Sequence, residues 1–216
     1  MSFKYLLFDL DGTLTDSAEG IINCVKYALS ELGLPQPPEK TLREFIGPPL
    51  KDAFMNCCGL DANTAENAVA KYRDRYSTVG LFENRVYDGV PQMLEALSKA
   101  GKTLILATSK PKIFADRILE KYNLLQYFSK TVGATLDGRI NYKDGVIEEI
   151  FKCCNIVDKS AAVMIGDRHY DIEASKKLGI SSVGVLYGYS KPRELENCGA
   201  DMLAAAPEEV ARLLLK

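Results

Sequence analysis

Short apolar runs that alternate with amphipathic stretches are the feature of this sequence that most constrains its fold. Six such runs end in turn residues and have the length of buried strands: 4–8, 103–107, 131–134, 161–165, 181–186 and 201–204. Stretches with helical spacing lie between or after them, at 90–100, 111–122, 144–154, 171–178 and 207–215. Strands that alternate with helices favour a parallel sheet covered by helices on both faces.

One long segment interrupts this alternation. Residues 16–84 carry no strand pattern, and helices are expected there at 17–32, 39–46, 49–58 and 62–78. We therefore predict an α/β fold in which a Rossmann-like core, residues 1–15 and 85–216, carries an all-α insert, residues 16–84, after its first strand.

Charge and cysteine content exclude several classes of partner. The chain has 27 Lys and Arg against 29 Asp and Glu, so no basic excess exists to bind a nucleic-acid backbone. The six cysteines show no C-x-x-C spacing, which favours free thiols in a reducing cytosol over zinc or redox chemistry. No apolar stretch reaches 18 residues, so we expect a cytoplasmic protein that does not span a membrane.

Acidic residues follow two of the predicted strands. Asp9 and Asp11 come directly after the first strand, and Asp167 follows the strand at 161–165. Ligands of open parallel sheets bind at the carboxyl ends of the strands, where these carboxylates would meet. Such a concentration of oxygen ligands suits Mg²⁺, whereas a single histidine argues against zinc. The alternative is that Asp9-Leu10-Asp11-Gly12 only forms a turn.

Three further polar residues lie where they could reach the same edge of the sheet. Thr108 and Ser109 follow the strand at 103–107 and precede a helix, which is a natural cradle for phosphate, although they could simply cap that helix. Lys143 begins the helix at 144–154, and the alternative for it is an ordinary surface lysine. His169 follows Asp167 on a loop, and we assign it no catalytic role.

The order of these residues resembles a known family. The segment Phe8-Asp9-Leu10-Asp11-Gly12-Thr13-Leu14-Thr15-Asp16-Ser17, followed by Thr108, Lys143 and the segment from Gly166-Asp167 to Asp171, is similar to the haloacid dehalogenase superfamily of phosphohydrolases. The resemblance covers essentially the whole chain. It includes the helical insert, which looks like the small α-helical cap of these enzymes.

The resemblance implies a role for each matched residue. It implies that Asp9 attacks phosphorus, that Asp11 acts as general acid and base, and that Thr108 and Lys143 hold phosphoryl oxygens. By the same resemblance, Mg²⁺ would bind Asp9, the backbone carbonyl of Asp11 and Asp167, with Asp171 supporting a metal-bound water. The chain departs from related phosphatases at one point, because Asp144 rather than proline follows Lys143.

The sequence also helps to distinguish phosphate-ester hydrolysis from three other functions, namely dehalogenation, sugar-phosphate mutase activity and non-catalytic binding. The proton donor expected at Asp11 favours phosphate esters over halides as substrates, because a leaving halide needs no proton. A sugar-phosphate mutase would use a cap histidine, but the single histidine lies in the predicted core, and the intact acidic set disfavours a non-catalytic binding module.

Residues 45–50 and an expected return strand at 80–84 look similar to phosphoglycolate phosphatases or, alternatively, to 5′-nucleotidases. Arg43 and Gly47 are the candidates for selecting a small phosphate ester, unless residues 47–49 only break a helix. The sequence leaves the oligomeric state open.

Overall fold

The computed structural model describes residues 3–216, which divide into two compact units. The larger unit takes the chain up to Thr15 and again from Val86 to Lys216, and the smaller unit is Asp16–Arg85. Two short strands, β2 (Thr15–Asp16) and β3 (Arg85–Val86), pair with each other where the chain passes from one unit to the other.

The larger unit is built on a six-stranded sheet of order β5-β4-β1-β6-β7-β8 with parallel pairing throughout. Its strands are β1 (Tyr5–Phe8), β4 (Thr103–Pro111), β5 (Phe128–Ala134), β6 (Ala162–Gly166), β7 (Ser181–Val185) and β8 (Met202–Ala204). Each strand overlaps one of the six apolar runs, so the predicted parallel sheet is confirmed.

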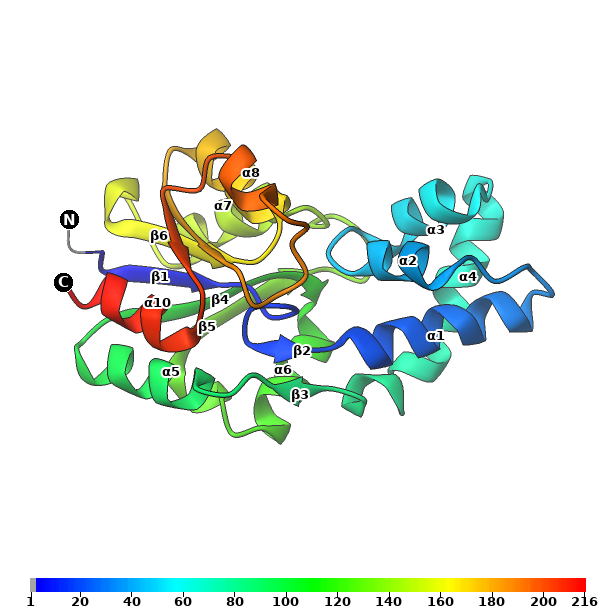
Figure 1. Cartoon of the computed structure of the whole chain (residues 1–216), viewed down its shortest axis with the longest axis horizontal. Helices are drawn as coiled ribbons and strands as arrows, with labels where there is room; N and C mark the ends of the chain where they lie inside the picture. The colour runs from blue at the N-terminus through cyan, green and yellow to red at the C-terminus, as the bar shows by residue number, and fades with distance from the viewer. Residues whose placement is uncertain (1–2) are drawn as a thin grey trace. The chain divides into compact units, whose positions relative to one another are not determined.

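Helices cover both faces of this sheet, as predicted (Figure 1). One face carries α5 (Val90–Lys99), α6 (Lys112–Lys121) and α10 (Pro207–Leu214), and the other carries α7 (Lys143–Cys153) and α8 (His169–Leu178). The short elements are η3 (Leu125–Tyr127), η4 (Lys159–Ala161) and α9 (Glu194–Asn197).

Packing of α7 against the centre of the sheet explains why this helix forms. Val146 and Ile150 lie one turn apart, so they share a face of the helix, and both are fully buried in one cluster with Leu7 of β1 and Met164 of β6. Burial of each such side chain stabilises the fold by about 1.5–3 kcal/mol. The same packing fixes the start of α7, where Lys143 lies.

The register of β1 places the candidate site. Phe8, the last residue of β1, pairs with Leu106 of β4 on one side and Ile165 of β6 on the other. The residues that follow these three positions therefore emerge side by side at one edge of the sheet. Those residues include Asp9 and, within two positions of the paired residues, Thr108 and Asp167.

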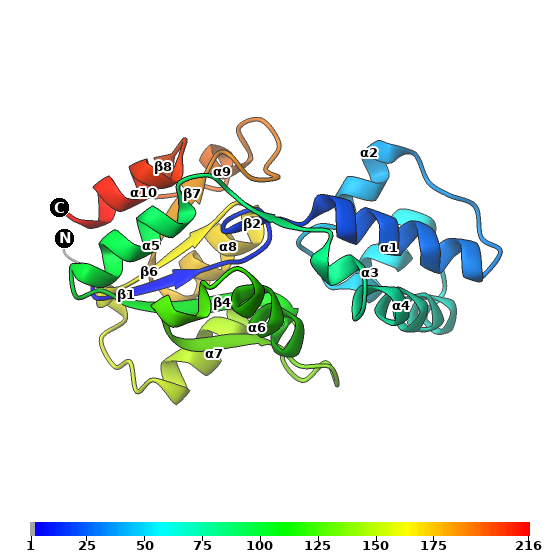
Figure 2. The same cartoon turned by 90° about the horizontal axis from the view of Figure 1, so that it is seen from below.

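The smaller unit is helical (Figure 2). It contains α1 (Ala18–Glu31), α2 (Glu39–Leu42), η1 (Arg43–Phe45), α3 (Leu50–Cys58), α4 (Ala62–Tyr76) and η2 (Gly80–Phe82). The helix expected at 39–46 is thus two shorter elements, α2 and η1. The start of α1 is supported by Asp16, whose carboxylate accepts a hydrogen bond of 3.3 Å from the amide of Ala18.

The expected return strand at 80–84 is wrong, because Gly80–Phe82 forms a 3₁₀ turn. This turn packs closely on α1: a Cβ added to Gly20 would lie 2.1 Å from the carbonyl oxygen of Gly80. The amide of Gly20 also donates a hydrogen bond of 3.1 Å to the carbonyl of Glu83. These contacts to α1 take the place of strand pairing.

The sequence also leads to expectations about membrane-spanning segments and about the state of the cysteines. None of the helices within residues 3–216 has both the length and the apolar character needed to cross a bilayer. The six cysteines form no disulfide in this part of the chain.

Candidate active site

Asp9 is held at the carboxyl end of the central strand. Its amide donates to the carbonyl of Ile165 at 2.9 Å, and its Oδ1 accepts from the amide of Leu10 at 2.8 Å. The same Oδ1 lies 2.8 Å from Nζ of Lys143. Within residues 3–216, Oδ2 accepts no hydrogen bond, so this oxygen is available to a ligand.

Lys143 is a buried lysine at the first position of α7, and the surface alternative is wrong for it. Its Nζ lies 2.9 Å from the carbonyl oxygen of Ala107, 2.8 Å from Asp9 and 2.9 Å from Oδ1 of Asp171. Burial alone would lower the pKa of Lys143, but the carboxylates of Asp171 and Asp9 outweigh burial and raise that pKa. The side chain therefore carries a full positive charge into the site.

Asp144, which stands where related phosphatases have proline, has its own contacts. Its Oδ1 accepts a hydrogen bond of 2.9 Å from the amide of Gly145, and its Oδ2 pairs with Lys177 of α8. A carboxylate in the first turn also interacts favourably with the helix dipole. Asp144 thus stabilises the start of α7 directly after Lys143.

Asp167 and Asp171 complete a buried acidic group with Asp9, in which one oxygen from each residue lies within 4.8 Å of the others. Oδ2 of Asp167 accepts a hydrogen bond of 2.7 Å from the amide of Tyr189, and Oδ2 of Asp171 accepts one of 3.1 Å from the amide of Arg168. Asp171 also pairs with Lys143, so both of its oxygens have protein partners.

Two carboxyl groups of this acidic group, those of Asp9 and Asp167, have raised pKa values. Burial raises the pKa of Asp9 to about 6, although Lys143 opposes the shift. Burial, together with the charges of Asp171 and Asp9, raises the pKa of Asp167 well above its ordinary value. Three buried carboxylates facing one ammonium leave an excess of negative charge, which a bound cation would remove.

The donor set fits a hard divalent cation. All the donors are carboxylate oxygens, which Mg²⁺ and Ca²⁺ prefer, and none is a thiolate or imidazole. Close packing also shapes the site, because a Cβ added to Gly12, whose φ is +83°, would lie 2.1 Å from Oδ2 of Asp167. Only glycine allows the backbone this near to the carboxylate.

Asp11 stands apart from the acidic group. Its Oδ2 lies 2.7 Å from Nζ of Lys110, while its Oδ1 is buried and, within residues 3–216, has no hydrogen-bond partner. The structure therefore separates the two carboxylates of the first motif: Asp9 faces Lys143 and the other acids, and Asp11 faces Lys110. The carboxylate of Asp11 does not belong to the acidic group formed by Asp9, Asp167 and Asp171, although the sequence predicts that the carboxylates after the strands meet.

Thr108 and Ser109 lie near the end of β4, four and three residues before α6 begins at Lys112. Thr108 is buried, and its Oγ1 accepts a hydrogen bond of 3.2 Å from the amide of Lys110. Ser109 is half-buried. Thr108 follows Ala107, whose carbonyl binds Lys143, and this brings the hydroxyl to the same edge of the sheet as Asp9.

His169 has a structural partner instead of a catalytic one. Its amide and its Nδ1 both lie 2.9 Å from Oε1 of Glu194, which also accepts a hydrogen bond of 3.0 Å from Nε of Arg168. Burial alone would raise the pKa of Glu194, but hydrogen bonds from the Lys191 and His169 amides, His169 and Arg168 lower it to about 2. Glu194 thereby holds the start of α8, where His169 is the first helical residue and does not lie on the expected loop.

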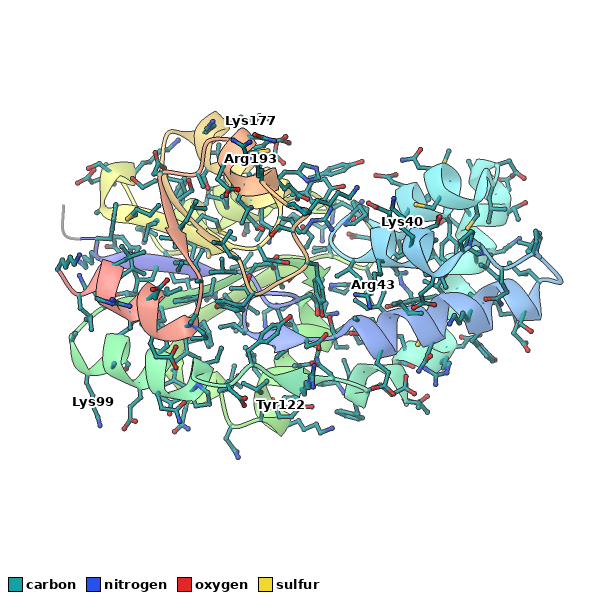
Figure 3. The ribbon with its side chains drawn as sticks, in the orientation of Figure 1. Lys40, Arg43, Lys99, Tyr122, Lys177 and Arg193 are labelled. Carbon is teal, nitrogen blue, oxygen red and sulfur yellow. The ribbon has the colours of Figure 1, made fainter. Side chains whose placement is uncertain are left out.

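The candidate specificity residues lie in the smaller unit. Arg43 begins η1, and its side chain is exposed (Figure 3). Gly47 follows η1 with a φ of +114°, a conformation that favours glycine. The backbone conformation alone therefore explains why glycine stands at this position. Neither residue belongs to the part of the chain that carries the acidic group.

Comparison with known proteins decides the family. A model of the haloacid dehalogenase-like hydrolases matches residues 6–185, which span both units. The chain belongs to this family. The match includes each of the residues at the strand ends described above, from Asp9 to Asp171.

Individual proteins are also similar to this chain over most of its length. A 5′-nucleotidase of Pseudomonas aeruginosa is 41% identical over 195 residues, covering 90% of this chain and 88% of the relative. The tyrosine-protein kinase PtkA of Mycobacterium tuberculosis is 36% identical over 188 residues, which are 87% of this chain and 64% of that protein. Relatives of lower identity include enzymes named phosphoglycolate phosphatase, one of them, from Cupriavidus necator, 33% identical.

A crystal structure of a predicted phosphatase from Clostridium acetobutylicum has 42% identity and a TM-score of 0.95, covering 100% of this chain and 99% of that one. The likeness therefore extends over the complete haloacid dehalogenase-like fold, smaller unit included.

Proposed function

We propose that the protein is a Mg²⁺-dependent phosphate-monoester hydrolase that works through an aspartyl-phosphate on Asp9. The observation that carries this proposal is the different setting of the two carboxylates after β1. Asp9 keeps Oδ2 open beside a buried lysine, as a nucleophile requires. Asp11 keeps one buried oxygen without a partner, as a group that exchanges a proton with substrate requires.

The first chemical step forms a bond between Oδ2 of Asp9 and phosphorus while the bond from phosphorus to the leaving oxygen breaks. Asp11 gives its proton to that leaving oxygen. Lys143 provides positive charge next to Asp9 throughout, and the hydroxyl of Thr108, with Ser109 beside it, orients phosphoryl oxygens. Positioning and charge neutralisation are the main requirements of phosphoryl transfer.

The second step hydrolyses the phosphorylated aspartate. A water molecule loses a proton to Asp11 as its oxygen bonds to phosphorus, and the bond from phosphorus to Asp9 breaks with its electron pair returning to the carboxylate. Asp11 ends this step protonated and ready for the next ester. One residue thus acts first as acid and then as base, which conserves protons over the cycle.

Asp9, Asp167 and the backbone carbonyl of Asp11 are the residues that would hold Mg²⁺, as the family resemblance implies, with Asp171 supporting a metal-bound water. When bound, Mg²⁺ neutralises charge on the phosphoryl oxygens and lets two negatively charged groups approach each other.

The smaller unit, residues 16–84 in the sequence-based division, is in this proposal the cap that selects the leaving group, with Arg43 and Gly47 among its candidate residues. The sequence predicts phosphoglycolate as the substrate, with a nucleoside monophosphate as the alternative. The relative named 5′-nucleotidase is 41% identical and the phosphoglycolate phosphatase of Cupriavidus necator is 33% identical, which favours a nucleoside monophosphate over phosphoglycolate as the substrate.

The free thiols support a reducing, cytoplasmic location, and no nucleic acid or membrane partner is proposed.

The test is phosphate release from p-nitrophenyl phosphate, nucleoside monophosphates and phosphoglycolate, with and without Mg²⁺. The D9N variant is the control, since its amide is a poor nucleophile of nearly the same shape. Transfer of a phosphoryl group to a tyrosine peptide is measured in parallel, because one relative is named a tyrosine-protein kinase. Activity of D9N equal to that of the wild type, or phosphate appearing only on tyrosine, would overturn the proposal.

A further inference from the structure

The pair formed by Lys110 and Asp11 is the feature of the site that no motif accounts for. Nζ of Lys110 lies 2.7 Å from Oδ2 of Asp11, and the two side chains are 6% and 14% exposed. Taking an ammonium and a carboxylate out of water is costly, and their attraction repays that cost only with good geometry. A lysine that could extend into solvent is instead kept against one carboxylate of the site.

An irregularity in β4 turns Lys110 toward the site. The pairing of β4 with β5 runs from Thr108 opposite Gly133 directly to Pro111 opposite Ala134, so Ser109 and Lys110 form a bulge. Bulges next to active sites commonly redirect a side chain. Two contacts stabilise this one: Oγ1 of Thr108 accepts from the amide of Lys110 at 3.2 Å, and Gly133 leaves room for the Lys110 carbonyl.

Gly133 is required for that room. A Cβ added to Gly133 would lie 2.6 Å from the carbonyl oxygen of Lys110, which is nearer than real contacts allow. The bulge, the hydroxyl of Thr108 and a glycine on the neighbouring strand therefore all fix the backbone of Lys110. An incidental ion pair on the protein surface would not require three separate features to fix the backbone of its lysine.

We infer that Lys110 is a positioning residue, which holds Oδ2 of Asp11 so that Oδ1 alone faces the reacting oxygen. This inference rests on the proposed function, in which Asp11 exchanges protons with the leaving group and with water. Oδ1 is the oxygen that is buried and lacks a partner within residues 3–216. With Oδ2 occupied, the carboxylate has one orientation and one site for the transferred proton.

The two steps of the reaction depend on Lys110 to different extents when the leaving group is p-nitrophenolate. That leaving group hardly needs a proton, so phosphorylation of Asp9 proceeds with a poorly oriented Asp11. Hydrolysis of the phosphorylated Asp9 still requires Asp11 to accept the proton of water. Loss of Lys110 should therefore slow the second step more than the first, and the phosphorylated enzyme should accumulate.

The experiment compares K110M with K112M, K110R and D11N. Lys112 is an exposed lysine two residues away that pairs with Asp116 on its own helix, so K112M controls for the loss of a nearby charge. With p-nitrophenyl phosphate, K110M should lower kcat about 10–100-fold with little change in KM, which is the scale of a misplaced catalytic group. A burst of nitrophenolate and phosphorylated Asp9 by mass spectrometry should appear in K110M but not in K112M, and K110R should restore part of kcat.

A double-mutant cycle shows whether Lys110 acts through Asp11. In the D11N background, K110M should change kcat less than about twofold, since the residue through which it acts is already lost. Equal behaviour of K110M and K112M, or a full effect of K110M in D11N, would overturn the inference. If wild-type protein releases no phosphate, the proposed function fails instead. If K110M does not fold, as judged by circular dichroism, K110Q is measured against the same expectations.

Discussion

Nζ of Lys143 lies 2.8 Å from Oδ1 of Asp9, and through this contact one buried side chain joins four elements of the larger unit. Lys143 starts α7, and its ammonium faces Asp9 after β1, donates a hydrogen bond to the carbonyl of Ala107 in β4 and reaches Asp171 of α8. Stability and chemistry therefore depend on the same group.

Replacement of Lys143 tests this dual role. K143M leaves Asp9 and Asp171 as buried carboxylates without their cation, so we expect the free energy of unfolding to fall by about 3–5 kcal/mol in urea titrations. Phosphatase activity should be lost in whatever fraction folds. The matched control is K177M on exposed Lys177, which should lower stability far less. Equal losses in the two variants would contradict a buried ion-pair role.

Removal of the cation is the second test. We expect excess EDTA to abolish phosphate release and added Mg²⁺ to restore it, because three acidic groups converge with one lysine to balance them. Mg²⁺ should also raise the melting temperature of the wild-type protein but not of D167N, which lacks one ligand. An undiminished rate in EDTA, or an equal rise in melting temperature for D167N, would argue against this site.

The pKa of Asp9 predicts how stability of the metal-free protein depends on pH. The folded value of about 6 exceeds the ordinary value of 3.8, so the folded state binds more protons than the unfolded state between these pH values. Stability from this group is thus greatest below about pH 4 and is lost as pH rises through about 6. We expect a loss on the order of 1–3 kcal/mol across this window in EDTA.

D9N is the control for this pH dependence, since its amide does not titrate. Plotted against pH, the free energy of unfolding of the wild type minus that of D9N should slope downward from pH 4 to pH 6. A flat or rising difference would show that the carboxyl of Asp9 is not destabilised in the folded protein.

Asp11 and Asp9 should fail in different ways when each is replaced by asparagine. D9N should not form a phosphorylated enzyme. D11N should lower turnover of alkyl phosphate esters by about 10²–10⁴-fold, because the proton donor for a poor leaving group is gone. With p-nitrophenyl phosphate, D11N should still give a burst and phosphorylated Asp9. Equal loss on both kinds of ester, without a trapped intermediate, would refute the division of roles.

Arg43 should affect the choice of substrate more than the chemistry. We expect R43A to change the ratio of kcat/KM values between nucleoside monophosphates and phosphoglycolate about tenfold, with p-nitrophenyl phosphate affected less than threefold. Lys40, an exposed cation on α2 near Arg43, provides the control K40A (Figure 3). Proportional losses on every ester would indicate that Arg43 only maintains the structure of its unit.

The fold could be read from the sequence because its signals are local. Each strand of the sheet is a short apolar run that ends in a turn, and each covering helix has a periodic apolar face such as Val146 and Ile150. The smaller unit was harder, since its 3₁₀ turns depend on contacts between distant residues. Gly80–Phe82 resembles a strand by composition, but its packing on Gly20 decides its form.

The site residues that have a local sequence signal could also be predicted, whereas those placed by contacts with distant residues could not. Asp9 and Asp167 could be proposed because they follow strands directly, and Thr108 because it follows the apolar run at 103–107, although β4 continues to Pro111. The structure brings all three to one edge of the sheet. Lys110 was missed, since a lysine near a strand end looks like a solvated residue and the bulge that redirects it depends on Gly133. The amide of Tyr189, which binds Asp167, was missed because a backbone donor leaves no mark on the sequence.

The position of β1 at the centre of the sheet has a consequence for synthesis of the protein. Tyr5 pairs with Thr103 on one side and with Ala162 on the other, so β1 is synthesised well before the two strands that pair with it. Such distant pairings form slowly. One edge of β1 can pair once β4 has been made, but the other edge stays unpaired until β6 has been made, which is the interval in which a chaperone would be needed most.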